Sequence, residues 1–129
     1  MATTGADEGF KKRLIVKVTV GAEAPEKLSQ AFTVASVAAA SGFDISLWLT
    51  GDATRFALPG EAETFSIEGA KPLREMLDVI LAAGTVSVCS QCAARRSITG
   101  DQLIAGATIR GASSFVEEIM QNGSESLVY

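Results

Sequence analysis

The sequence predicts an α/β protein, a flavodoxin-like three-layer α/β/α domain with a five-stranded, mainly parallel sheet. Two observations predict it. Short runs rich in β-branched residues occur five times along the chain, and stretches with apolar residues at helical spacing separate them. Strands that alternate with helices form a parallel sheet with helices on both of its faces. The pattern leaves the order of the strands in the sheet open.

The expected strands are short, and the first is almost continuously apolar, as central parallel strands are. Each run ends in a glycine, a polar residue or the chain terminus. The expected strands are residues 14–20, 44–50, 85–88, 107–110 and 126–129.

Two long helices are expected between the first three strands. Pro25 suits the first position of one helix, and Ser41 and Gly42 end it near residue 40. The other helix begins at Pro72 and ends at Gly84. In both, apolar residues recur three and four positions apart and should face the core. They are Leu28, Ala31, Phe32, Ala35 and Ala39 in the first helix, and Leu73, Met76, Leu77, Ile80 and Leu81 in the second.

Three shorter helices complete the expected pattern, at residues 93–97, at residues 103–105 and near the C-terminus. Ser113 and Ser114 are candidate N-caps of the last helix, and Glu117 lies at capping-box spacing from Ser114. The residues expected on the inner face of that helix are Phe115, Val116, Ile119 and Met120.

Residues 1–10 are expected to be a disordered leader, and residues 11–129 a single domain. Within the domain, residues 53–69 are expected to be a long loop of the kind that is often functional or mobile.

The chain has 129 residues, of which 47% are hydrophobic and 20% charged, which is apolar for so small a domain. No charged residue occurs between Lys27 and Asp44, so the first long helix is apolar on most of its sides. One face of that helix should cover the sheet and another should meet a second subunit. We therefore expect a homo-oligomer.

The composition argues against several classes of function. The net charge is −4 and no cluster of Lys and Arg is present, so we expect no nucleic-acid partner. No apolar stretch reaches the ~18 residues of a membrane span, and no signal peptide is visible, so we expect a cytoplasmic protein with no membrane partner. The absence of histidine excludes Ser-His and Cys-His pairs and histidine metal sites. No nucleotide-binding fingerprint stands out, and we expect no cofactor.

The candidate site is a Cys-x-x-Cys motif. Cys89 and Cys92 follow the third expected strand, at the edge where open α/β sheets bind ligands. Backbone N–H groups of the next turn lower the pKa of a thiol there, and Arg95 and Arg96 add positive potential. Asp52 follows the second strand and would line the same crevice. Simpler interpretations stay open: surface ion pairs for the arginines, a turn residue for Asp52, and two small buried hydrophobic side chains for the cysteines.

Three chemistries compete for the cysteine pair. The first is a dithiol/disulfide couple, but in the thioredoxin fold this spacing follows an early strand and accompanies a cis-proline loop. Here Pro25, Pro59 and Pro72 all precede the motif. The second is zinc, which needs four ligands where the motif supplies two, so we expect no metal site. The third is sulfur transfer, with a persulfide on Cys89.

The segment from Cys89 to Arg96 resembles the DsrE/DsrF-like family of small sulfur-relay proteins. Gly51 and Asp52 after the second strand, and the order and lengths of the elements, support the resemblance. The resemblance covers about residues 14–129. It implies a flavodoxin-like fold, assembly into dimers, trimers or hexamers, and a cysteine that accepts sulfur as a persulfide and passes it on. By position that cysteine is Cys89. Cys92 matches a second cysteine of some branches, and Ser97 takes the place of a glycine that often follows the arginine.

The resulting hypothesis is an oligomeric sulfur carrier, or a sulfurtransferase-like protein if it is active, with sulfur donor and acceptor proteins as partners. Cys89 is the nucleophile, and Cys92 either resolves the persulfide as a disulfide or protects it. The alternatives are a non-catalytic binding or scaffold protein of the same fold, and a general dithiol/disulfide oxidoreductase.

Overall fold

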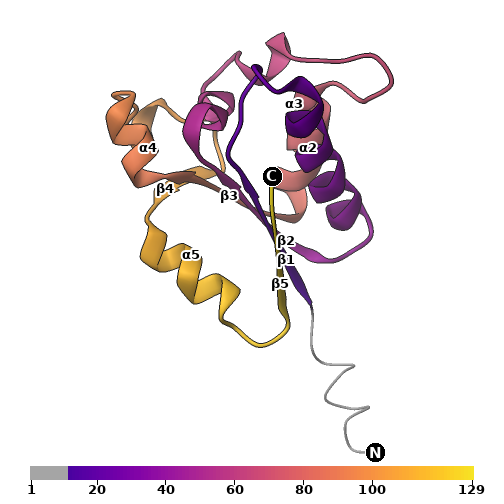
Figure 1. Ribbon diagram of the computed structural model, residues 1–129, viewed down its shortest axis with the longest axis vertical. Helices are drawn as coiled ribbons and strands as arrows, with labels where there is room; N and C mark the ends of the chain where they lie inside the picture. Colours follow the sequence, from indigo (N-terminus) through magenta and orange to yellow (C-terminus); the bar gives the residue numbers. More distant parts are fainter. Residues whose placement is uncertain (1–11) are drawn as a thin grey trace, which may run out of the picture.

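The computed structural model describes residues 12–129, and the leader expected at residues 1–10 lies outside the described residues. Five strands form one sheet in which all neighbouring strands are parallel, in the order β4-β3-β2-β1-β5 (Figure 1). The predicted α/β class and parallel sheet are confirmed. The strands are β1 (Arg13–Val18), β2 (Asp44–Leu49), β3 (Gly84–Cys89), β4 (Ala107–Arg110) and β5 (Ser124–Val128).

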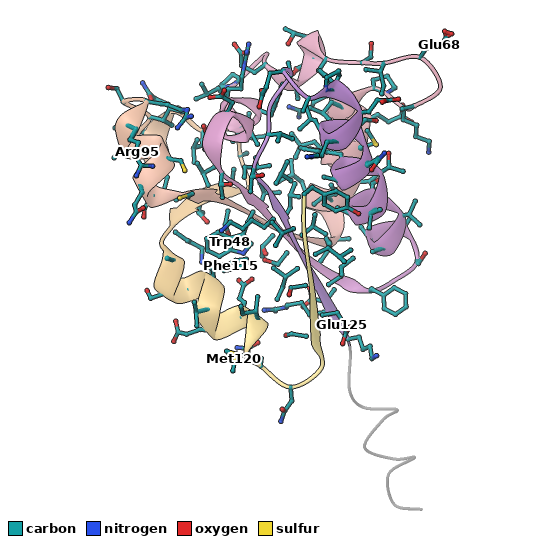
Figure 2. The ribbon with its side chains drawn as sticks, viewed as in Figure 1. Trp48, Glu68, Arg95, Phe115, Met120 and Glu125 are labelled. Carbon is teal, nitrogen blue, oxygen red and sulfur yellow. The ribbon has the colours of Figure 1, made fainter. Side chains whose placement is uncertain are left out.

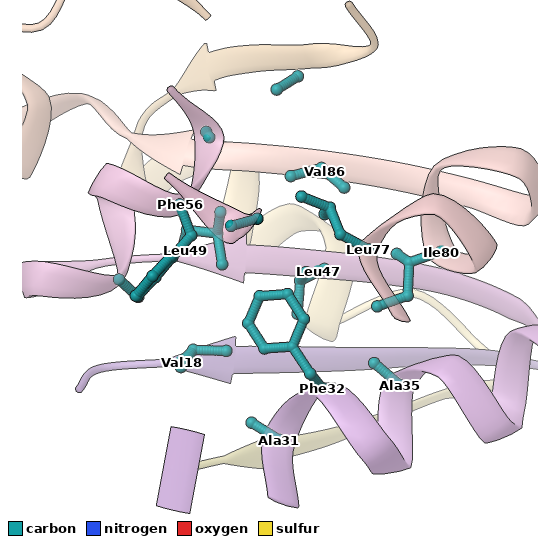
Figure 3. Packing of buried hydrophobic residues seen from close by; sticks show 14 of the residues in the cluster. Val18, Ala31, Phe32, Ala35, Leu47, Leu49, Phe56, Leu77, Ile80 and Val86 are labelled. Carbon is teal, nitrogen blue, oxygen red and sulfur yellow. The ribbon is translucent and has the colours of Figure 1, made fainter. Parts of the chain in front are cut away.

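Helices α2 (Pro25–Ala40) and α3 (Leu73–Ala83) cover one face of the sheet (Figure 1). All five residues of the predicted α2 stripe are buried, as are four of the five predicted in α3. Phe32 lies against Leu47 of β2 in the middle of this layer (Figure 3). Each large side chain buried here contributes about 1.5–3 kcal/mol relative to its exposed state, so this layer is the main hydrophobic core.

Helix α5 (Ala112–Ile119) lies on the opposite face of the sheet, and α4 (Ser90–Arg95) continues directly from β3 (Figure 1). The side chains that β1 to β4 turn toward α5 are largely polar. They include Lys17, Ser46, Trp48, Ser87 and Arg110, and they contact α5 or the groups bonded to it. The two faces of the sheet therefore differ in character, one packed with aliphatic side chains and the other with hydrogen-bonding groups.

The inner face predicted for the last helix is wrong in part. Val116 and Met120 are 52% and 75% exposed, whereas Glu118 is only 5% exposed. The helix begins at Ala112 after the N-cap Gly111, so the predicted serine N-caps lie inside it. The physical reason is that α5 meets a polar sheet face, where a carboxylate finds hydrogen-bond donors.

The expected loop at residues 53–69 contains two 3-10 helices, η1 (Gly51–Ala57) and η2 (Ala62–Thr64). Phe56 of η1 is buried, and Phe65 meets it edge to face with the ring centroids 6.0 Å apart. The segment is thus fixed to the core by aromatic packing.

The helix expected at residues 103–105 is wrong. A 3-10 helix, η3 (Gly100–Gln102), precedes it, and Thr99 and Gln102 close that helix as a capping box. The main-chain N–H of Ile104 donates to the carbonyl of Ala57 at 2.9 Å, which draws these residues out of helical geometry.

Candidate functional site

Cys89 is both the last residue of β3 and the N-cap of α4. The buried side chains of Val86 and Val88 anchor the strand in the α2/α3 layer, and alternation along the strand turns Cys89 to the α5 face. The Cys89 side chain is half-buried and is not in a disulfide. The strand thus delivers a free thiol to the carboxyl edge of the sheet, where the sequence places it.

Opposing influences act on the Cys89 thiol. Burial disfavours the thiolate and would raise its pKa. Hydrogen bonds from the main-chain N–H and the thiol of Cys92, a bond from the N–H of Gln91 and the charge of Lys17 act the other way. Together they hold the pKa of Cys89 below its usual value. A larger fraction of Cys89 is therefore thiolate at a given pH, and the thiolate is the nucleophilic form of cysteine.

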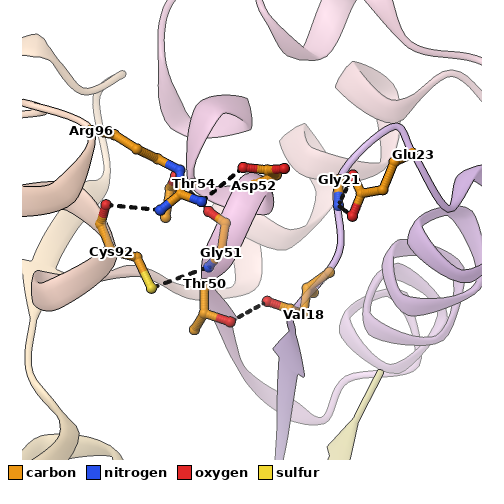
Figure 4. A network of polar contacts seen from close by, with 9 residues as sticks. All are labelled: Val18, Gly21, Glu23, Thr50, Gly51, Asp52, Thr54, Cys92 and Arg96. Carbon is orange, nitrogen blue, oxygen red and sulfur yellow. Dashed lines mark hydrogen bonds and ion pairs between the residues drawn. The ribbon is translucent and has the colours of Figure 1, made fainter.

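Cys92 is placed differently. Its Sγ accepts a hydrogen bond from the main-chain N–H of Gly51 at 3.2 Å, across the gap between α4 and the start of η1 (Figure 4). Gly51 itself follows β2, and its carbonyl accepts a bond from the Thr54 hydroxyl at 2.8 Å. Cys92 thus lies on the same turn of α4 as Cys89 and contacts the end of β2 through Gly51, and it joins two segments that are 41 residues apart in sequence.

Arg96 connects the same two segments. Its guanidinium donates to the carboxylate of Asp52 at 2.8 Å and to the carbonyl of Cys92 at 3.2 Å (Figure 4). Both side chains of this ion pair are substantially exposed. The structure therefore brings together four of the five predicted site residues, while Arg95 is exposed on the outer side of α4 (Figure 2). The part that the two arginines play at the thiolate stays a prediction.

A buried polar cluster under α5 was missed by the sequence reasoning. The carboxylate of Glu118 accepts bonds from the Ser46 hydroxyl at 2.6 Å, the Trp48 indole at 3.1 Å and the Arg110 guanidinium at 2.6 Å. Arg110 also donates to the Ser87 hydroxyl at 3.2 Å. Burial alone would raise the pKa of Glu118, but these hydrogen bonds and the charge of Arg110 lower it. The carboxylate is therefore ionised and fully partnered.

This cluster borders the Cys89 site. Arg110 is the residue paired with Cys89 across β3 and β4. Its guanidinium lies over the Trp48 ring at 5.2 Å, and Trp48 meets Phe115 of α5 edge to face at 5.3 Å (Figure 2). Lys17 lies over the Phe115 ring, with its Nζ 4.9 Å from the ring centroid. The signal available in the sequence was Lys17, a lone charge inside an apolar strand.

Comparison with known proteins identifies the family. Residues 12–128 match the sequence model of the DsrE/DsrF-like family. The chain belongs to this family. The match spans nearly the whole described part of the chain and includes both cysteines.

Two solved structures share the fold. The ychN protein from E. coli superposes with a TM-score of 0.74 at 22% identity, covering 93% of this chain and 100% of the other. A conserved protein of unknown function from Bacteroides thetaiotaomicron superposes with a TM-score of 0.59 at 15% identity, covering 92% and 95%. No curated protein sequence shows significant similarity. DsrE/DsrF-like proteins are generally linked to sulfur relay and typically form small oligomers.

The turn after α4 has an unusual backbone conformation at Ser97. Its φ is +56°, in the left-handed region that favours glycine. The backbone after α4 therefore keeps a glycine-type turn despite the side chain.

Other features of the described residues bear on the range of functions. Across residues 12–129, no group of three or more His, Cys, Asp or Glu side chains is arranged to hold a metal ion. None of the helices in that range has the length and apolar character needed to cross a membrane. A groove of about 460 Å³ lies between α2 and the amino ends of β1 and β5, at the sheet edge opposite the cysteines.

Proposed function

We propose that this protein is a sulfur carrier in which Cys89 accepts sulfur as a persulfide and passes it to an acceptor. The observation that carries the proposal is the position of Cys89 at the end of β3 and at the N-cap of α4, beside the N–H groups of Gln91 and Cys92 and the Cys92 thiol. They favour the thiolate, which is the form that attacks sulfur. The family's general link to sulfur relay supports the same reaction.

The loading step balances without any other reagent. The Cys89 thiolate attacks the outer sulfur of a persulfide donor, a new S–S bond forms on Cys89, and the donor leaves as its thiolate. In the second step an acceptor thiolate attacks the outer sulfur on Cys89, and the Cys89 thiolate leaves. Each step needs a stabilised thiolate on Cys89, as nucleophile first and as leaving group afterwards.

Intact mass spectrometry tests the assignment. Wild type and Cys89→Ser are incubated with glutathione persulfide, desalted and weighed with and without reductant. We expect a reductant-sensitive gain of sulfur in the wild type or in its Cys92→Ser variant, and none in Cys89→Ser. Equal loading of Cys89→Ser would show that Cys89 is not the acceptor. No loading of any variant would favour the non-catalytic binding protein instead.

We propose that the protein is a homo-oligomer, because Val37 and Phe43 beside the α2 groove are 59% and 48% exposed. Val37→Glu should then shift the mass measured by static light scattering toward a smaller species. We place the reaction in the cytoplasm, with sulfur donor and acceptor proteins as partners, because it requires both thiols in reduced form.

A second candidate, a dithiol/disulfide oxidoreductase, is favoured by the placement of the two cysteines on one turn of α4. It predicts a Cys89–Cys92 disulfide with a reduction potential in the range of cellular dithiol carriers. Equilibration with a glutathione series and alkylation of the remaining thiols would measure that potential. A pair that stays reduced throughout the series would exclude this candidate.

A further inference from the structure

We propose that Cys92 gives the Cys89 persulfide an internal discharge route, in which sulfur that finds no acceptor leaves as hydrosulfide. This inference rests on the proposed function, because it begins from a sulfur loaded on Cys89. It adds a persulfide-reducing activity to the relay and assigns it to contacts that this chain makes around Cys92.

The first contact is between the thiols. Cys89 is the N-cap of α4 and Cys92 is the third residue of that helix, so the two side chains leave the same helical turn on the same side and their sulfur atoms are neighbours before any reaction. Once Cys89 is loaded, that same Cys89 atom is the inner sulfur of the persulfide. Cys92 is therefore held against the inner sulfur, which is the atom whose attack forms a protein disulfide.

The second contact supplies charge stabilisation. The Gly51 N–H donates to the Cys92 sulfur at 3.2 Å, so a negative charge that develops there meets a main-chain donor. Two further hydrogen bonds hold the backbone around Gly51 in place. The Thr54 hydroxyl binds the Gly51 carbonyl at 2.8 Å, and the Ala53 N–H binds the Thr50 carbonyl at 3.0 Å. The donor comes from the end of β2, outside the Cys-x-x-Cys motif itself.

The discharge step consumes only the loaded Cys89 and the Cys92 thiol. Cys92 gives up its proton and its sulfur attacks the inner sulfur of Cys89–S–S⁻. The Cys92–Cys89 disulfide bond forms, the bond to the outer sulfur breaks, and that sulfur leaves as HS⁻ with the proton from Cys92. In this step the Cys92 sulfur is oxidised from the thiol to the disulfide level, the outer sulfur is reduced to sulfide, and the Cys89 sulfur, already oxidised by the loading, keeps its oxidation state. A dithiol reductant, small-molecule or protein, then restores the two thiols by exchange.

The two fates of the sulfur compete. An acceptor thiolate must reach the outer sulfur from solution, whereas Cys92 lies on the same helical turn as Cys89 and acts at a fixed effective concentration. Transfer of the sulfur to an acceptor is therefore faster than discharge as hydrosulfide only when the acceptor is already bound. Without one, each loading ends in hydrosulfide and an oxidised, inactive pair.

The test separates loading from discharge. Wild type, Cys92→Ser, Cys92→Ala and Cys89→Ser are reduced, loaded with glutathione persulfide and freed of donor by gel filtration. Hydrosulfide is then trapped over time, and the protein is alkylated and weighed. We expect the wild type to release about one hydrosulfide per loaded chain and to end as an alkylation-resistant disulfide. Both Cys92 variants should retain the sulfur, with release at least about tenfold slower.

Each alternative result has a definite meaning. Retention of sulfur by the wild type for as long as by both Cys92 variants would overturn the discharge route and leave the carrier function standing. Failure of both Cys92 variants to load, together with a wild type that neither gains sulfur nor releases hydrosulfide, would overturn the carrier function and the discharge route together. Circular dichroism of the Cys92 variants identifies a folding defect, and the pair of substitutions guards against a defect peculiar to one of them.

Discussion

The main-chain N–H of Gly51 donates a hydrogen bond to the sulfur of Cys92, at 3.2 Å. Through this bond the turn that follows β2 meets the helix that follows β3. The two segments are neighbours because β2 and β3 are parallel, so both strands end at the same edge of the sheet. The second cysteine of the motif is thus positioned by a distant segment as well as by its own helix.

Gly51→Ala should disturb this contact. The φ of Gly51 is +55°, and a Cβ there would lie 2.9 Å from the Thr19 carbonyl oxygen. We expect the free energy of unfolding to fall by roughly 2–4 kcal/mol, from left-handed strain plus the displacement of this backbone. Chemical denaturation of both proteins measures this difference in the free energy of unfolding.

Gly60→Ala is the matched control, because its φ is +83° and nothing lies within 4 Å of the added Cβ. It should cost about 1–2 kcal/mol, the left-handed strain alone. Equal losses in the two variants would show that the approach to Thr19 is relaxed without cost.

Lys17→Met should raise the pKa of Cys89. The lysine charge favours the thiolate, so its removal shifts ionisation to higher pH. The methionine keeps an apolar stem against Phe115, which limits the structural change. Thiolate absorbance in the Cys92→Ser background, where one thiol titrates, would report the shift. Lys27→Met, on an exposed position of α2, should leave the titration unchanged, and a shift of equal size there would contradict the assignment.

Glu118→Gln should destabilise the fold. The amide keeps the shape of the side chain but removes the charge that Arg110 pairs with at 2.6 Å in a site where Glu118 is 5% exposed. We expect a loss of about 1–3 kcal/mol in the free energy of unfolding. Glu117→Gln, on the exposed side of the same helix, is the control and should change stability by less than about 0.5 kcal/mol.

The Glu118 effect should also depend on pH. Because the folded state lowers the pKa of Glu118, its ionised form stabilises the fold above the unfolded pKa of about 4.3, and this contribution is lost as the pH falls through the folded pKa. The gap in stability between wild type and Glu118→Gln should therefore be largest near neutral pH and close in acid. A gap that stays constant down to the acid transition would mean that Glu118 is not ionised in the folded protein.

Much of the fold could be predicted because local pattern and tertiary environment agree. The α2 stripe, from Leu28 to Ala39, has helical spacing and meets an aliphatic sheet face, so periodicity identifies the core correctly. The last helix shows the opposite case. Its apolar pattern favours Val116 and Met120 as inner residues, but the burial of Glu118 is decided by donors on β2 and β4, far away in sequence.

The site could likewise be predicted in part: the position of Cys89 could be, but the contacts around it could not. The position of Cys89 follows from a strand ending at a Cys-x-x-Cys motif, which local sequence reveals. The contacts of Lys17 and Gly51 depend on the strand order and on the path of η1, which carries no apolar periodicity. Such contacts become visible only when the parallel strands are set side by side.

Arg96→Gln should expose Cys92 without unfolding the protein. Arg96 holds Asp52 and the Cys92 carbonyl together, and loss of this exposed ion pair should change stability by less than about 1 kcal/mol. In the Cys89→Ser background, however, Cys92 should be alkylated several-fold faster, because the start of η1 is no longer tied to α4. High salt should produce part of the same effect in the unmutated pair by screening it.

Arg74→Gln provides the control for this last prediction. It removes another exposed arginine ion pair, to Asp78 at 2.9 Å on α3, and it leaves the segments around Cys92 untouched. A similar small change in stability with no change in Cys92 alkylation would separate the local role of Arg96 from a general loss of surface charge. Equal alkylation rates in the Arg96 and Arg74 variants would instead show that the Gly51–Cys92 contact holds without the ion pair. Arg96 would then be an ordinary surface residue.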